Sequence, residues 1–158
     1  MERNDNYTVS IYSTPLSLPL FFAVHTHVVC TYKTESNRFD VTGHVSSSHP
    51  TAIDRYIFKN LLPTEAGFRI LPSLPTHGIG PRWTVTLHSS VTGPAKSPAH
   101  QLYTYIVSGG LQNYPYRDRY HMFLGPNSNT FTQWVVDQVP ECKLKLPWNA
   151  WGKGYIQR

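Results

Sequence analysis

The chain has 158 residues and a mass of 18.0 kDa, which is enough for one domain and short for two. Hydrophobic residues make up 40% of it, so it can bury a core and is not a disordered chain. The net charge of +5 comes from scattered basic residues with no run of three, which argues against a nucleic-acid-binding protein.

No stretch of the sequence predicts a transmembrane helix. The longest apolar-looking stretch, residues 15–24, is interrupted by Pro15 and Pro19 and falls short of the roughly 20 residues that a membrane span needs. The first residues lack the basic-then-apolar order of a signal peptide. We therefore expect a soluble and, by default, cytoplasmic protein.

Alternating polar and apolar residues predict strands in the first third of the chain. The predicted strands are residues 7–12, 21–32 and 39–45, with a polar turn at residues 34–38. Because side chains alternate between the faces of a strand, His25 and His27 should share one face. We expect an irregular excursion rich in Pro and Gly over about residues 46–81.

The second half of the chain predicts one further strand and two helices. Residues 82–89 alternate as a strand. Ser97-Pro98 is typical of a helix start and Gly109 of a helix end, while Asn127 is a natural N-cap for a second helix that Pro140 closes. The Trp- and Gly-rich tail should pack back onto the core. These elements predict one α+β domain over residues 1–158, with a mostly antiparallel sheet and two principal helices.

The two cysteines do not indicate a metal ribbon or a redox pair, because Cys30 and Cys142 match no CxxC spacing. A single bridge between them stays open. Strand alternation points Cys30 away from His25, so we expect it in the core. Cys142 precedes Lys143, which could lower the pKa of its thiol.

The last third of the chain resembles a mostly bacterial domain family of unknown function. The resemblance rests on the block GPNSNTF, residues 125–131, and on LPWNAWGKGY, residues 146–155, which matches an LPxxAxGKxY pattern. The segment HTHVV at His25 fits an early motif of the same family, with His27 where a Trp is usual. We therefore expect His27 to be a partly buried structural residue.

A more distant resemblance is to circularly permuted papain-like domains, of the NlpC-type and lecithin:retinol acyltransferase-like groups. Those domains place a His early on a strand, a second polar residue on the next strand, and a Cys at a helix N-terminus. His25, His44 and Ser128 follow that order here, with Ser in place of Cys. The resemblance implies a permuted papain-like fold.

Two function classes follow. In the first, a hydrolase or acyltransferase acts on an amide or ester, with Ser128 as nucleophile and His25 as base. His44, or Asp40 on the same face, would orient His25, and helix N–H groups would form the oxyanion hole. In the second, an inactive relative binds a peptide, glycan or acyl ligand in its cleft. The bland interpretation of Ser128 is that it and Asn127 cap the helix.

Other polar residues are weaker candidates. Asn127, Asn129 and Thr130 could contact a ligand at the helix start, and Lys153 could bind an anionic or carbonyl group, unless it is a solvated residue of a glycine turn. His25 and His27, with His44 or His49, could form a zinc site, but no HExxH motif or carboxylate companion is visible. The sequence therefore predicts no metal and no cofactor.

Overall fold

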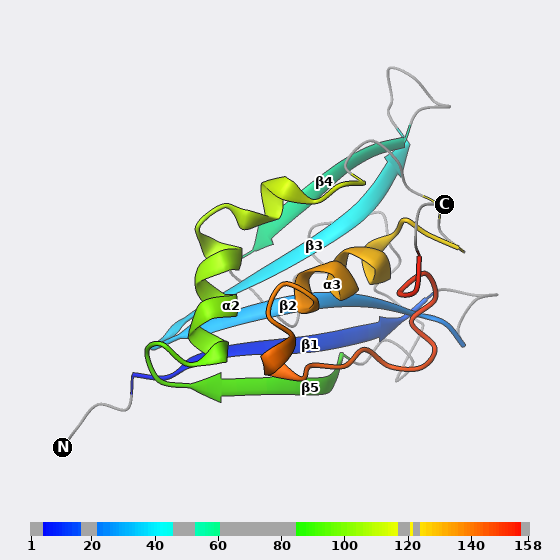
Figure 1. The fold of residues 1–158 in the computed structure, drawn as a ribbon. Coiled ribbons are helices and arrows are strands. Elements are labelled where there is room, and N and C mark those ends of the chain that lie inside the picture. Colours follow the sequence, from blue (N-terminus) through cyan, green and yellow to red (C-terminus); the bar gives the residue numbers. More distant parts are fainter. Residues whose placement is uncertain are drawn as a thin grey trace.

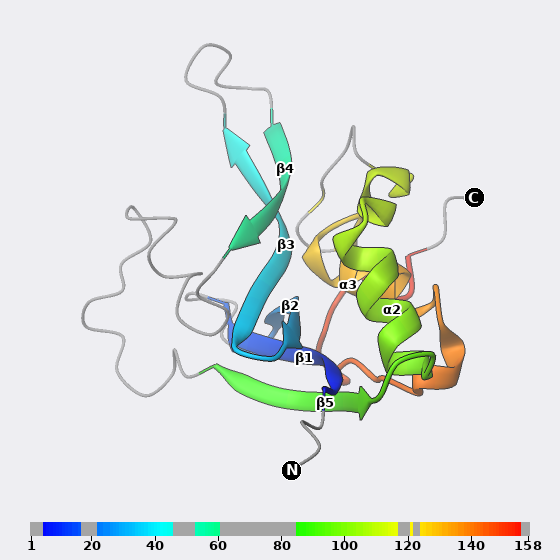
Figure 2. The same cartoon turned by 90° about the vertical axis from the view of Figure 1, so that its left-hand side faces the viewer.

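The computed structural model describes residues 5–16, 22–45, 53–60, 85–116, 121 and 124–155. Within these residues, five strands form one antiparallel sheet in the order β4-β3-β2-β1-β5. Helices α2 (Pro98–Val107) and α3 (Ser128–Val136) lie together on one face of the sheet (Figures 1 and 2). The predicted class, α+β with a mostly antiparallel sheet and two main helices, is confirmed.

The three N-terminal strands form a meander. β1 (Tyr7–Pro15) pairs along its whole length with β2 (Val24–Tyr32), and β2 continues into β3 (Glu35–Val45). The turn occupies only Lys33 and Thr34, and Lys33 has a positive φ of 54°. The predicted turn over residues 34–38 was therefore too long. A two-residue hairpin turn, with positive φ at Lys33, lets β3 begin at Glu35 and pair with β2 from there.

The segment expected to be an irregular excursion contains a strand. β4 (Ile53–Asn60) pairs with β3 from Val45 opposite Ile53 to Arg38 opposite Asn60. Its sequence, IDRYIFKN, mixes charged and apolar residues without alternation, so periodicity did not reveal it. The rest of residues 46–81 lies outside the described residues.

In the second half of the chain the predicted strand and two helices are present, with ends that differ from the predicted ones. β5 (Thr86–Gly93) pairs with β1, and residues 82–84 of the predicted strand lie outside the described residues. The Ser97 side chain caps α2 by accepting a hydrogen bond from the backbone N–H of His100, as predicted. Gly109 follows the helix with φ of 96° and starts the short 3-10 helix η2 (Gly110–Asn113). Positive φ is the conformation that favours glycine there.

The core lies between the helices and one face of the sheet. α2 packs on β1 and β5, while α3 packs on β2 and β3. The strands contribute Val9, Ile11, Val24, Val28, Cys30, Phe39 and Val41, and the helices contribute Leu102, Ile106, Phe131, Val135 and Val136. Cys30 is fully buried, as predicted.

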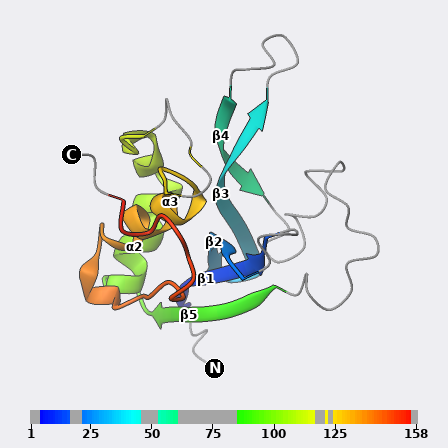
Figure 3. The ribbon, with the colours of Figure 1, turned by 90° about the vertical axis from the view of Figure 1, so that its right-hand side faces the viewer.

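The tail after α3 stays on the helix side of the sheet (Figure 3). α3 ends at Val136, earlier than predicted, and Pro140 begins the 3-10 helix η3 (Pro140–Cys142). Leu144, Leu146 and Ala150 are buried in the core, which confirms that the tail packs back. None of the helices in the described part of the chain is long and apolar enough to span a membrane.

Candidate functional site

The candidate site lies where β2 and β3 separate. The two strands pair from Tyr32 opposite Glu35 to Val28 opposite Phe39, and in the described part of the chain no pair follows beyond that point. His27 and Asp40 stand at the next position of the two strands. Within the residues that the structure describes, β3 continues by pairing with β4, and no strand pairs with the first half of β2 on that side.

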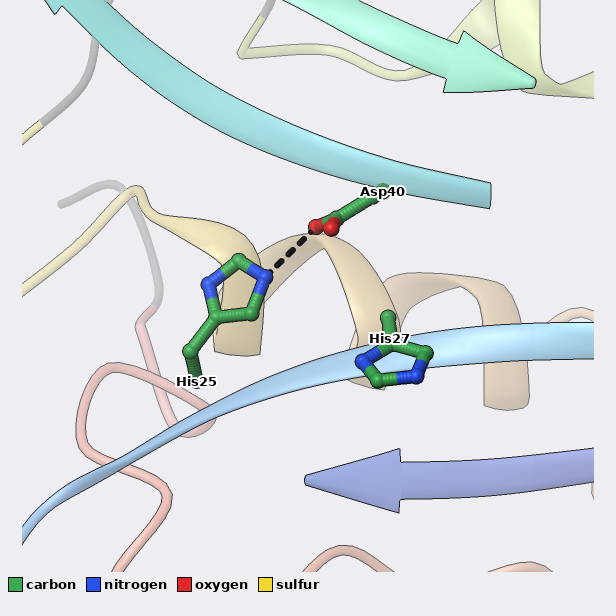
Figure 4. A group of neighbouring side chains, drawn as sticks. All are labelled: His25, His27 and Asp40. Carbon is green, nitrogen blue, oxygen red and sulfur yellow. Dashed lines mark ion pairs between the residues drawn. The ribbon is translucent and has the colours of Figure 1, made fainter. Parts of the chain in front are cut away.

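Three side chains, those of His25, Asp40 and Arg38, contact one another where β2 and β3 separate. His25 Nε2 lies 2.8 Å from Asp40 Oδ1, and the other carboxylate oxygen of Asp40 pairs with the Arg38 guanidinium. Asp40 and Arg38 are buried, whereas the side chain of His25 is 17% exposed. Figure 4 shows the carboxylate of Asp40, on β3, directed at His25, on the neighbouring strand β2. Solvent therefore reaches this group from the His25 side.

Asp40 is ionised in this environment. Burial raises the pKa of its carboxyl, but the charges of His25 and Arg38 outweigh burial and leave the pKa well below its usual range. The carboxylate can therefore hold the His25 ring in one orientation through Nε2.

His27 lies beside this pair. Its side chain is completely buried, and its ring stacks on Tyr12 of β1 with centroids 5.8 Å apart. One ligating atom each of His25, His27 and Asp40 lies within 4.8 Å of the others. The carboxylate companion that the sequence did not reveal is Asp40, on the neighbouring strand. The His27 ring is more deeply buried than the partly buried residue we expected.

The first turn of α3 is fixed against the free edge of β2 by one amide. Asn129 Oδ1 accepts hydrogen bonds from the Thr26 backbone N–H and hydroxyl, at 3.0 and 2.9 Å. Asn129 Nδ2 donates to the carbonyls of Val24 and Trp151, both at 2.8 Å. Thr26 and Val24 are the residues on either side of His25, so α3 begins beside the β2 backbone at this point, whereas strand alternation directs the His25 side chain to the opposite face of the sheet.

Asn127, and not Ser128, caps α3. The Asn127 side chain accepts hydrogen bonds from the backbone N–H groups of Asn129 and Thr130, as predicted for an N-cap. Ser128 is the first helical residue and is buried. No hydrogen bond of its hydroxyl, to His25 or elsewhere, occurs within the described residues. Capping therefore does not account for Ser128.

The remaining predicted ligand residues contact the chain itself. Thr130 Oγ1 donates to the Gly152 carbonyl at 2.6 Å, and Lys153 Nζ donates to the Pro147 carbonyl at 2.8 Å. Gly152 has φ of 89°, and a Cβ there would meet the Asn127 side chain at 2.5 Å. The glycine turn at residues 152–154 thus packs against the helix cap. Ligand contacts of these residues stay predictions.

His44 belongs to β3, but its side chain lies outside the described part of the structure, as does all of His49. The residue that the structure places against His25 is Asp40, the second orienter that the sequence offered. Sequence reasoning missed Arg38 altogether. The signal that could have found it is the alternation of Arg38 and Asp40 on one strand face.

Both cysteines are free and buried, so the possible bridge between them is not formed. Burial raises the pKa of the Cys30 thiol far above its usual value. The pKa of Cys142 is also raised, by burial and then by the charge of Glu141. The expected lowering by Lys143 was wrong, because burial outweighs a solvated neighbouring charge.

The comparison with protein families agrees with the resemblance found in the sequence. The model of the family described as "Protein of unknown function (DUF3750)" matches residues 6–155. The chain belongs to this family. No curated protein and no solved structure matches it.

The family match spans β1 to the C-terminal glycine turn. It therefore includes every residue of the candidate site. The description of the family names no activity.

Proposed function

We propose that this DUF3750 member cleaves or transfers an acyl group of an ester or amide, with Ser128 as nucleophile and His25 as base. The observation that carries the proposal is the His25–Asp40 pair, 2.8 Å apart, on the stretch of β2 to which Asn129 joins the first turn of the helix that bears Ser128. Asp40 replaces His44 as the proposed orienter, because it is the group that lies against His25.

The chemistry follows from which ring nitrogen is engaged. Because Nε2 of His25 faces Asp40, Nδ1 is the nitrogen that takes the hydroxyl proton of Ser128. The Ser128 oxygen then bonds to the acyl carbon. The bond to the leaving group breaks as His25 returns the proton to it. Water or a second acceptor attacks the resulting acyl ester and restores Ser128.

The oxyanion would be bound by fewer helix N–H groups than the sequence suggested. The N–H groups of Asn129 and Thr130 are already bonded to the Asn127 side chain. The N–H of Ser128 is the remaining donor in this turn that we assign to the oxyanion. Ser128 and His25 share no hydrogen bond within the described residues, and strand alternation directs the His25 ring to the face opposite α3, so substrate binding has to bring the two side chains together between β2 and β3.

The test is labelling with a fluorophosphonate probe, which reacts with activated serines. Wild type should be labelled, and Ser128→Ala and His25→Ala should each abolish labelling because one removes the nucleophile and the other the base. Ser108→Ala, at the end of α2, is the matched control and should label as wild type. A folded wild-type protein that stays unlabelled would contradict the proposal.

A second candidate, ligand binding without catalysis, is favoured by an exposed aromatic pair next to the site. The rings of Phe22 and Trp151 lie 5.0 Å apart and are 46% and 38% exposed. The Trp151 carbonyl accepts hydrogen bonds from Asn127 and Asn129, so the pair adjoins the start of α3. Exposed aromatic rings commonly contact ligands at binding sites.

This second candidate has its own measurement. Trp151→Ala should weaken the binding of a peptide, glycan or acyl ligand found by screening, whereas Ser128→Ala should leave that binding unchanged. Under the catalytic proposal wild type is labelled by the fluorophosphonate probe and Ser128→Ala is not, whereas under this second candidate wild type itself stays unlabelled.

A further inference from the structure

His25, His27 and Asp40 together have the donor atoms of a metal site. The acyl-transfer proposal uses His25 and Asp40 but not His27. His25 and His27 come from alternate positions of β2, and Asp40 comes from the adjacent position of β3 (Figure 4). We propose that these three residues bind a divalent transition-metal ion, and that their chemistry favours Zn²⁺. Two imidazole nitrogens and one carboxylate oxygen are a donor set that zinc uses in proteins.

The distances suit such an ion. One ligating atom of each residue lies within 4.8 Å of the others. In a tetrahedral zinc site with bonds of about 2.0–2.1 Å, neighbouring ligand atoms lie about 3.3 Å apart. His25 Nε2 and Asp40 Oδ1, at 2.8 Å, lie at hydrogen-bond distance, about 0.5 Å closer together than two ligands of one zinc ion. An ion bound here would part His25 Nε2 from Asp40 Oδ1 and bring in a ring nitrogen of His27, which lies within 4.8 Å of both ligating atoms.

The surroundings prepare these groups for an ion. The Arg38 guanidinium pairs with the far oxygen of Asp40 and leaves Oδ1 directed at His25. Such a partner orients a ligating carboxylate. The stacked Tyr12 ring fixes the plane of His27. His25 is the one partly exposed member of the cluster, so water or an anion can reach a fourth position from its side.

The ion would also compete with the proposed catalysis, since both use His25 and Asp40. This consequence rests on the acyl-transfer proposal, whereas the binding of the ion does not. Zn²⁺ should lower fluorophosphonate labelling and a chelator should restore it. Ser128→Ala should still bind the ion, so the failure of one proposal is distinguishable from the failure of the other.

The experiment is a Co²⁺ titration of untagged, chelator-treated full chain, followed by visible absorption, with Zn²⁺ as competitor. We expect one ion per chain, with the absorption of a four- or five-coordinate site, displaced by Zn²⁺. His27→Gln and His25→Gln should each weaken binding more than about 100-fold, beyond the 10–100-fold typical of losing an outer-shell partner. His25→Gln is the safer variant for folding because its side chain is partly exposed.

The chain has eight histidines, so a matched control is needed. His100→Gln removes a histidine of α2 that lies outside the cluster, and it should bind Co²⁺ as wild type does. Circular dichroism checks that each variant is folded. Wild type that binds less than one ion per chain, or a folded His25→Gln protein with wild-type affinity, would overturn the proposal.

Discussion

Asp40 is the residue on which the site depends. It is buried, and it neutralises Arg38, a buried cation on its own strand, while it orients His25 on the next. Removing one partner of a buried ion pair leaves an uncompensated charge, which costs more than the pair itself contributes. Asp40 is thus needed for stability as well as for either proposed function.

Asp40→Asn should lower the free energy of unfolding by about 3–5 kcal/mol at pH 7, because Arg38 loses its counter-charge. The pKa of Asp40 is lower in the folded protein than its usual value near 3.9, so its contribution is complete above about pH 5 and declines as the pH falls. Urea unfolding at pH 7, 5 and 3 should show the gap between wild type and variant narrowing at pH 3.

The matched control for this change is Glu35→Gln, which removes an exposed carboxylate from the same strand. It should change stability by less than about 0.5 kcal/mol at every pH. A gap between wild type and Asp40→Asn that stays constant from pH 7 to pH 3 would show that the carboxylate charge is not what stabilises the protein.

At the scale of the elements, one amide joins α3 to the sheet. β3 leaves β2 after Val28, so Val24 and Thr26 lose the strand that would have bonded their backbone. Asn129 bonds both residues, and the Asn149 carbonyl accepts a hydrogen bond from the Val24 N–H at 3.4 Å. A buried backbone edge is thereby satisfied without a neighbouring strand, as buried polar groups require.

Asn129→Ala should destabilise the protein by about 3 kcal/mol or more, because several buried backbone groups lose their partner at about 1–3 kcal/mol each. Chemical denaturation measures the change. Gln133→Ala, in the same helix, removes only a surface bond to Asp137 and should cost less than about 0.5 kcal/mol. Equal losses for the two variants would show that the link from α3 to β2 contributes little.

At the scale of the whole molecule, stability depends on the layer between the helices and one face of the sheet. Ile106 of α2 is 2% exposed within that layer, while its neighbour Val107 is 42% exposed. The two positions are neighbours in sequence and lie about 100° apart around the helix, so Ile106 faces the sheet while Val107 faces solvent.

Ile106→Ala should lower the free energy of unfolding by about 2–5 kcal/mol, because it removes buried methyl groups and leaves a cavity. Val107→Ala removes exposed methyl groups and introduces a better helix former, so it should change stability by less than about 0.5 kcal/mol. Guanidinium unfolding of both variants tests this. If Val107→Ala were the more damaging, the orientation of α2 on the sheet would be wrong.

Much of the fold could be predicted because its signals are local. The alternation around Val28 and Cys30, and the capping side chains of Ser97 and Asn127, depend on residues only a few positions apart. Two wrong predictions of the fold concern segments that carry no such local signal. β4 lacks alternation, and the turn at Lys33 depends on a positive φ that a lysine residue does not predict.

By itself, then, the sequence determined the α+β class, the helix starts and the shared face of His25 and His27, because periodicity and capping depend on residues that are close together in the sequence. Only the tertiary structure decided which carboxylate meets His25, that β2 and β3 separate at that point, and that Asn129 fills the edge they leave. Those contacts join residues 15 to 105 positions apart. Their partners are chosen by strand register and helix packing, which no local pattern encodes.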